Sequence, residues 1–259
     1  MWPMSTRITI AQDFKAWRKD MVSLPDTLKT GQAEKLYDGR NKIWLLSRGE
    51  VKYVVKCFHT LGFIKGVIYT FFRKNKAIRA FHNGILLESK GVKTPKPIAL
   101  IEQKRLGLYH KLYYVSTYTD WLPIRKPLTE DSPFNKPMTI DYAHFVAALH
   151  EKGIIHKDLN NTNVLYHLNG QHYEFMLIDI NRMTFTSDGK AAPYEDCLEN
   201  LTLFADRGEM FDTFAAEYVK ARGWDASHIA DVFNAKAKHD RHWQRKKKLK
   251  SLIHRHHGE

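Results

Sequence analysis

The chain lacks the features that mark a secreted or membrane-embedded protein. It has only two cysteines, Cys57 and Cys197, in 259 residues, which is too few for a disulfide framework and fits a reducing compartment. Its most apolar stretch, residues 61–72, is interrupted by Lys65 and is shorter than the roughly 20 residues of a membrane-spanning helix. Residues 1–5 show no basic region followed by an apolar one, which argues against a secretory signal. We therefore expect a cytoplasmic protein.

Acidic residues are scarce relative to basic ones. The 41 Lys and Arg residues against 28 Asp and Glu residues give a formal net charge of +13. At 43% hydrophobic and 12% aromatic residues, the chain is too apolar for intrinsic disorder, and its length allows one large domain or two lobes. The excess charge predicts an anionic partner: nucleic acid, a phosphate-bearing ligand or an anionic membrane surface. Charge alone does not choose among these.

The pattern of the first half predicts a sheet and one long helix. Five runs rich in β-branched and aromatic residues are bounded by turn residues such as Gly39 and Gly49, and they predict strands. These runs are residues 34–37, 42–46, 53–58, 98–102 and 112–118. Between the third and fourth runs, apolar residues recur at three- and four-residue steps over residues 73–90, which predicts a helix that ends at Gly91.

The second half begins with a proline-rich connector and then becomes mostly helical. A helix is predicted over residues 139–152, with Thr139 as its N-cap and Asp141 in its first turn. Two short strands follow, at residues 163–166 and 173–180, joined by an Asn-Gly turn, and residues 194–238 are helical in pattern.

These elements predict an α+β protein with two lobes. The strand-rich N-lobe comprises residues 1–118 and the connector residues 119–137. The helical C-lobe comprises residues 138–240, and a basic, histidine-rich tail follows over residues 241–259.

The densest chemical signal is the run His-Lys-Asp-Leu-Asn-Asn-Thr-Asn-Val-Leu at residues 156–165. It has the H-x-D-L-x-x-x-N form of the protein-kinase catalytic loop. In that chemistry Asp158 accepts or orients the proton of the substrate hydroxyl, and Asn163 holds a Mg²⁺ ion that bridges the nucleotide phosphates. A polar loop whose Asp and Asn only stabilise turns is the alternative. The match at His156, Leu159 and the trailing Val-Leu pair favours the catalytic reading.

Two further residues extend this pattern. Asp179 ends an apolar strand, in the place of the metal-binding Asp-Phe-Gly aspartate of kinases, although this chain has Asp-Ile-Asn there. A carboxylate is the hard oxygen ligand that Mg²⁺ requires. Lys56 lies inside an apolar strand and, by analogy with kinases, reaches the nucleotide α- and β-phosphates. A lysine on the solvent face of a half-buried strand is the alternative, and Cys57 is expected to point to the opposite face.

Three departures from protein kinases are visible. The glycine-rich loop is reduced to Gly39, with Arg40 beside it as a possible source of positive charge for phosphate. The helix over residues 73–90 offers Asn83 rather than a glutamate to Lys56. Asn160 replaces the lysine that is usual in Ser/Thr kinases, and no long activation segment follows Asp179. These departures argue against a protein substrate.

Three segments together resemble the lipopolysaccharide core kinase family of Kdo and heptose kinases. They are residues 156–165, the Leu-Ile-Asp-Ile-Asn-Arg run at 177–182 and the Gly-Val-Lys-Thr-Pro-Lys-Pro-Ile run at 91–98. The similarity covers about residues 34–220. The resemblance implies a bilobal kinase fold that transfers the ATP γ-phosphate to a sugar hydroxyl of the lipopolysaccharide inner core. It also implies Asp158 as the base, Asn163 and Asp179 as Mg²⁺ ligands, and Lys56 as a phosphate-binding residue.

Other uses of the fold remain open alternatives: a kinase for a small molecule or a protein, or a nucleotide-binding scaffold without catalysis. The oligomeric state has no signature in the sequence. With two anionic substrates in view, nucleic acid becomes the less favoured partner, and we expect the enzyme to lie at the inner membrane surface.

Two segments bear on that expectation. Residues 63–74 mix bulky apolar side chains with flanking cations, which suits either a membrane interface or, more simply, a buried helix. Residues 241–255 carry seven Lys and Arg residues and no acidic residue. This stretch could meet an anionic leaflet, bind a nucleic-acid backbone, or be only a solvated helix end. Its histidines have no cysteine or acidic partner at metal-ligand spacing.

Overall fold

A computed structural model describes residues 4–31, 33–39, 41–59, 70, 75–187, 189–204 and 208–255, with the backbone alone given for residues 59 and 249–255. The chain divides into two compact units. The first comprises Met1–Trp121 and Met176–Arg182, and the second comprises Leu122–Phe175 and Met183–Glu259. The first crossing therefore falls inside the segment predicted as a connector, and a short later segment returns to the first unit.

The first unit is built on a six-stranded antiparallel sheet with the strand order β1-β5-β6-β4-β3-β2. The strands are β1 (Met4–Ile10), β2 (Glu34–Asp38), β3 (Lys42–Arg48), β4 (Val51–His59), β5 (Pro97–Arg105) and β6 (Leu108–Thr117). The last five confirm the predicted strands. The turn between β3 and β4 places Gly49 at a φ of 58°, a conformation that glycine adopts without strain.

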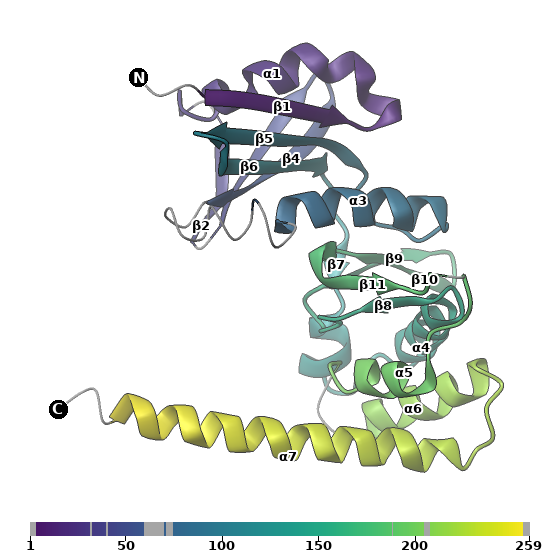
Figure 1. Ribbon diagram of the computed structural model, residues 1–259. Helices are drawn as coiled ribbons and strands as arrows, with labels where there is room; N and C mark the ends of the chain where they lie inside the picture. The colour runs from purple at the N-terminus through teal and green to yellow at the C-terminus, as the bar shows by residue number, and fades with distance from the viewer. Residues whose placement is uncertain are drawn as a thin grey trace. The chain divides into compact units, whose positions relative to one another are not determined.

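Helices cover both faces of this sheet (Figure 1). On one face, η1 (Gln12–Trp17) and α1 (Arg18–Thr27) pack Trp17 and Met21 against sheet residues that include Cys57. On the other face, α3 (Lys76–Ser89) packs Phe81 against sheet residues that include Phe58. Because strand residues alternate between faces, β4 presents its even-numbered side chains to the α3 face. This alternation fixes where Lys56 points.

The second unit combines helices with two small sheets. Its elements are β7 (Leu122–Pro123), the π-helical turn η2 (Lys126–Glu130), α4 (Lys136–Glu151), β8 (Ile154–His156), β9 (Val164–Asn169), most of β10 (His172–Leu177), β11 (Met183–Phe185), α5 (Tyr194–Leu201), α6 (Glu209–Ala221) and α7 (His228–Arg255). One sheet has the order β10-β9-β7 and the other pairs β11 with β8. The segment that returns to the first unit carries η3 (Ile180–Arg182).

An aromatic cluster forms the core of the second unit. The ring of the fully buried Tyr142 lies 4.8 Å from that of Phe204, 5.3 Å from that of Phe175 and 5.4 Å from that of Phe214, measured between centroids. Such tilted ring pairs add about 0.5–1.5 kcal/mol each beyond the burial of apolar area. The cluster joins α4 to α6 and to β10. In the sequence, α4 precedes and β10 follows residues 156–165, which we call the kinase-like loop.

The predicted start of α4 was wrong by three residues. The helix begins at Lys136, and Asn135 is its N-cap, with its Oδ1 accepting a hydrogen bond from the Met138 amide at 3.0 Å. Thr139 is fully buried inside the helix, and its hydroxyl donates to the carbonyl of Asn135. Pro137 does not exclude a helix here, since proline is tolerated in the first turn, where its missing N–H has no partner to lose.

The predicted tail is continuous with α7. The first half of α7 is anchored by Val232 and Lys236, which are 1% and 3% exposed, whereas every side chain from residue 241 to 248 is exposed. Figure 1 shows this helix continuing past α5 and α6. Within the described ranges, no helix is long and apolar enough to cross a membrane. Apart from Thr70, the predicted interface segment 63–74 lies outside the described residues.

Candidate active site

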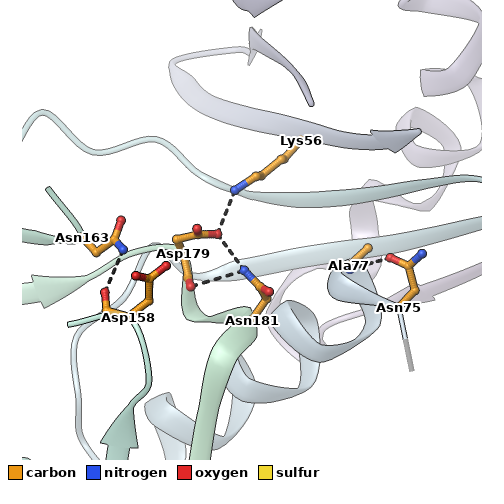
Figure 2. A network of polar contacts seen from close by, with 7 residues as sticks. All are labelled: Lys56, Asn75, Ala77, Asp158, Asn163, Asp179 and Asn181. Atoms are coloured by element: carbon orange, nitrogen blue, oxygen red, sulfur yellow. Dashed lines mark hydrogen bonds and ion pairs between the residues drawn. The ribbon is translucent and has the colours of Figure 1, made fainter. Parts of the chain in front are cut away.

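Lys56 projects from β4 on the face that α3 covers. Its Nζ lies 3.0 Å from Oδ1 of Asp179, with the two side chains 23% and 36% exposed (Figure 2). The ammonium group also lies 5.5 Å from the centroid of the Phe58 ring. Cys57 points to the other face, where it is buried, and burial raises the pKa of its thiol to about 11. Lys56 is therefore a partly buried, ion-paired residue of β4 and does not lie on a fully solvated face of the strand.

Asp179 has an unusual backbone conformation that aims its carboxylate. Its φ is 52°, in the left-handed region that Asp and Asn tolerate better than most residues. Oδ1 of Asp179 accepts a second hydrogen bond, from Nδ2 of Asn181 at 2.8 Å (Figure 2). The residues Asp-Ile-Asn thus form a compact turn in which Asn181, only 4% exposed, orients the carboxylate. Asn181 stands where the Asp-Phe-Gly motif of kinases has a glycine.

Asn83 has a different partner from the one predicted. Its Nδ2 donates to the carbonyl oxygen of Ile180 at 2.7 Å, and the partner of Lys56 is the carboxylate of Asp179. The expectation that Asn83 would take the place of the helix glutamate beside Lys56 was therefore wrong. Asn83 instead ties α3 to the residue that follows Asp179, and the lysine charge is offset by Asp179 itself.

The kinase-like loop is closed by its own side chains. Nδ2 of Asn163 donates to the backbone carbonyl of Asp158 at 2.9 Å (Figure 2). Nδ2 of Asn160 donates to Oδ1 of Asp158 at 3.2 Å. The amide of Asp158 donates to Nδ1 of His156 at 3.2 Å. These bonds explain the spacing of the motif, since an asparagine five positions on can reach back to the carbonyl of the aspartate.

The loop rests on a buried network that the sequence did not reveal. Nδ2 of Asn200, on α5, donates to the carbonyl of His156 at 2.8 Å. Oδ1 of Asn200 lies 3.0 Å from Nε2 of His150, whose Nδ1 lies 2.7 Å from the hydroxyl of Tyr218. Burial lowers the pKa of His150 to about 4, so its ring is neutral at physiological pH. Three helices therefore fix the backbone two residues before Asp158.

The predicted phosphate loop is only partly described. Gly39 lies in the turn between β2 and β3, where its N–H donates to the carbonyl of Asn41 at 3.3 Å. A Cβ at this position would clash with the ring of Tyr37, so a larger residue would require that exposed side chain to move. Arg40 lies outside the described residues. In this conformation the amide of Gly39 is used within the turn.

The residues present suit a divalent cation of the Mg²⁺ type. Because Nδ2 of Asn163 is held by the Asp158 carbonyl, its Oδ1 is left as an acceptor, and no donor in the described part of the chain reaches it. Asp179 supplies a carboxylate, and both groups are hard oxygen ligands. The described residues contain no cluster of three or more His, Cys, Asp or Glu side chains that would hold a metal alone. Each is a ligand of the kind that Mg²⁺ takes together with phosphate oxygens.

The fold and these residues define the class of protein. An antiparallel sheet carrying a paired lysine, together with a helical unit carrying an Asp–Asn loop, is the architecture of a protein-kinase-like phosphotransferase. Residues 28–203 match the model of the lipopolysaccharide kinase (Kdo/WaaP) family, and the chain belongs to that family. The resemblance identified from the sequence is thereby confirmed. Membership of a kinase family implies the use of ATP.

One solved structure agrees with this assignment at the level of the fold. The structure of WaaP in complex with acyl carrier protein matches with a TM-score of 0.62 at 14% identity, over 92% of this chain and 98% of that one. The Rio2 kinase from Chaetomium thermophilum, in an ADP/Mg²⁺-phosphoaspartate complex, matches with a TM-score of 0.44 at 14% identity, over 92% of this chain and 82% of that one. The structure of WbdD with a kinase inhibitor matches with a TM-score of 0.46 at 18% identity, over 78% of this chain and 44% of that one. No curated protein sequence matches the chain.

Proposed function

We propose that this protein transfers the γ-phosphate of ATP to a hydroxyl of a Kdo or heptose residue in the inner core of lipopolysaccharide. The observation that carries the proposal is the loop in which Asn163 closes onto the backbone of Asp158, in a chain of the lipopolysaccharide kinase family. The family supports the phosphotransfer and the lipopolysaccharide substrate. The identity of the sugar is the finer part of the proposal.

Asp158 is the residue that we assign to the acceptor hydroxyl. The hydroxyl oxygen attacks the γ-phosphorus, the bond from that phosphorus to the β,γ-bridging oxygen breaks, and ADP leaves with that oxygen. The hydroxyl proton passes to the carboxylate of Asp158. Asn160, which donates to Oδ1 of Asp158, orients this carboxylate. The short connection from Asp179 to α5, with only η3 and β11 in its described part, leaves no activation segment for a protein substrate.

Lys56, Asp179 and Asn163 are assigned to the nucleotide. Bound Mg²⁺ would supply positive charge to the β- and γ-phosphates, and Asp179 and Asn163 are the residues that would hold it. Lys56 carries the cation for the nucleotide phosphates, and its ion pair with Asp179 keeps the ammonium in place before ATP binds. Gly39 and Arg40 remain candidates for the phosphate turn. We reassign Asn83 from the nucleotide to the positioning of the Asp179 turn.

We further propose that the enzyme works on the cytoplasmic side of the inner membrane, held there by the exposed part of α7. Five cations lie at exposed positions on this stretch, Arg241, Arg245, Lys246, Lys247 and Lys248. Each basic residue near an anionic leaflet contributes about 1 kcal/mol, and the attraction falls with salt.

The test is a direct phosphotransfer assay. The purified protein is incubated with Mg-ATP and lipopolysaccharide whose core phosphates have been removed, and the product is analysed by mass spectrometry. Addition of one phosphoryl group to a Kdo or heptose residue, lost when EDTA is added, is the expected result. Transfer of phosphate only to other sugars or proteins offered as acceptors would favour another substrate. An absence of ATP turnover with every acceptor would favour a scaffold without catalysis.

A further inference from the structure

A hollow in the second unit lies beside the kinase-like loop. It has a volume of about 650 Å³, within the range of about 300–1,000 Å³ that small-molecule sites occupy. The loop contributes Asn161 to its wall, and η2 contributes Thr129, whose hydroxyl accepts a hydrogen bond from Nδ2 of Asn161 at 3.3 Å. The remaining wall comes from the segments around α6 and from α7. We call it the loop-side pocket.

The distance from this pocket to Asp158 is limited by the chain itself. Asn161 is three residues beyond Asp158, and three residues span at most about 11 Å. The bond between Asn163 and the Asp158 carbonyl folds the loop back and shortens this reach. A ligand that fills the pocket against Asn161 therefore contacts the same loop that carries the proposed base.

Two ion pairs, rather than an unbalanced patch, supply most of the charged groups of the pocket. Nζ of Lys236 donates to Oδ1 of Asp240 at 2.7 Å and to the carbonyl of Thr202 at 3.2 Å, and Lys236 is only 3% exposed. At the rim, Arg125 pairs with Glu130 at 2.7 Å. Paired carboxylates and cations offer acceptors and donors side by side, which suits hydroxyl groups that both donate and accept. They give little net field to attract a free phosphate.

The apolar groups of the pocket complete a carbohydrate site. Trp243 of α7 lines it and is 55% exposed, so part of its surface is open to a ligand. Phe134 lines it as well, and Leu128 is buried beneath. Sugar rings present apolar C–H faces between their hydroxyls, and an aromatic ring next to paired charges contacts both kinds of surface.

We propose that the loop-side pocket binds the carbohydrate of the acceptor and that Trp243 contacts a sugar ring there. This inference rests on the proposed function and adds the place on the chain where the acceptor is recognised. A second hollow, of about 950 Å³, is lined by α5 and α7. Its described lining includes no residue of the loop 156–165, so we do not assign the acceptor to it.

The experiment replaces Trp243 and follows the acceptor separately from ATP. The variants are Trp243→Ala, Trp243→Phe and, as the matched control, Gln244→Ala, which is the next exposed residue of the same helix and does not line the pocket. The probe is core oligosaccharide released from lipopolysaccharide and freed of phosphate. We expect Trp243→Ala to raise the KM for the oligosaccharide about tenfold, with Trp243→Phe close to the native value. The KM for ATP and the rate of ATP hydrolysis without acceptor should not change.

Direct binding of the oligosaccharide, measured by calorimetry, separates this inference from the proposed function. If the native protein binds the oligosaccharide, and Trp243→Ala weakens that binding although no phosphate is transferred, the pocket stands and the proposed reaction fails. If phosphate is transferred and Trp243→Ala and Gln244→Ala have the same KM, the pocket assignment is overturned and the reaction stands. Absence of both binding and transfer overturns both.

Discussion

The side-chain amide of Asn200 joins the backbone of His156 to the ring of His150. Its Nδ2 donates to the His156 carbonyl at 2.8 Å, and its Oδ1 lies 3.0 Å from Nε2 of His150. Because the ring is neutral, Nε2 carries its proton and donates to Asn200, while Nδ1 accepts from the hydroxyl of Tyr218. Every polar atom of this chain of contacts has a partner, so the position of the loop is set by helices α4, α5 and α6 together.

Replacement of Asn200 by leucine should destabilise the protein by about 2–4 kcal/mol, because the His156 carbonyl and the His150 N–H would both be buried without a partner. Urea unfolding followed by circular dichroism measures the loss. Asn234→Leu is the control, since it makes the same change on an exposed position of α7. Equal unfolding midpoints for the two variants would show that the Asn200 bridge contributes nothing to stability.

Protonation of His150 should make the protein less stable in acid. Desolvation by burial lowers its pKa from 6.5 to about 4, with Arg222 acting in the same direction. Between these values the unfolded chain binds a proton that the native histidine does not, so stability is full above 6.5 and falls as the pH approaches 4. The loss is on the order of 3 kcal/mol. His150→Gln should lose less stability over this pH range than the native protein, whereas His167→Gln, at an exposed site, should behave like the native protein.

The ion pair of Lys56 and Asp179 makes a prediction about the nucleotide. Lys56→Met removes the cation that we assign to the phosphates and should reduce kcat/KM for ATP by about 10²–10³-fold, the effect of losing one preorganised electrostatic contact. Lys52→Met is the matched control, because Lys52 lies on the same face of β4 and is exposed. Steady-state kinetics at saturating acceptor measure the difference. A Lys56→Met enzyme with the native kcat/KM would exclude this role.

Asp158 should be required for transfer and dispensable for nucleotide binding. Asp158→Asn keeps the size of the side chain but removes the proton acceptor, so kcat should fall by about 10²–10⁴-fold. The affinity for a non-hydrolysable ATP analogue, measured by calorimetry, should stay close to that of the native protein. Asp131→Asn, at an exposed position, is the control. Turnover retained in Asp158→Asn would rule out Asp158 as the base.

The parts of this protein that the sequence predicted are those with a local signal. Turn glycines and alternating runs predicted β2 to β6, and the spacing of Asp158 and Asn163 has a local cause, the bond that closes the loop. The first strand was missed because its burial is weak along most of its length, and only its pairing with β5 defines it. The helix start at Lys136 was missed because Pro137 lies in the proline-rich segment predicted as a connector.

The side-chain partners could not be predicted from sequence, because they join residues far apart along the chain. The amide of Asn83 was expected beside Lys56 from its position in the helix, but its partner is the carbonyl of Ile180. Nothing in the residues around Asn200 indicates that it bridges two histidines, since an asparagine in a helix usually has no such role. Tertiary packing alone creates both contacts.

The exposed part of α7 makes the last prediction, about the membrane. Removal of residues 241–259 makes Asp240 the last residue of the chain. Its ion pair with Lys236 is kept, so the fold should remain intact. The truncation should also weaken binding to vesicles that contain anionic lipid at low salt.

The double variant Arg245→Glu/Lys246→Glu should weaken binding in the same way. Lys126→Glu/Lys136→Glu, an equal change of charge at exposed positions elsewhere in the second unit, should not. Cosedimentation at increasing salt measures the effect, which should shrink as the Debye length falls below about 8 Å. Equal binding of the native protein, the truncated protein and Arg245→Glu/Lys246→Glu at low salt would exclude α7 as the membrane contact.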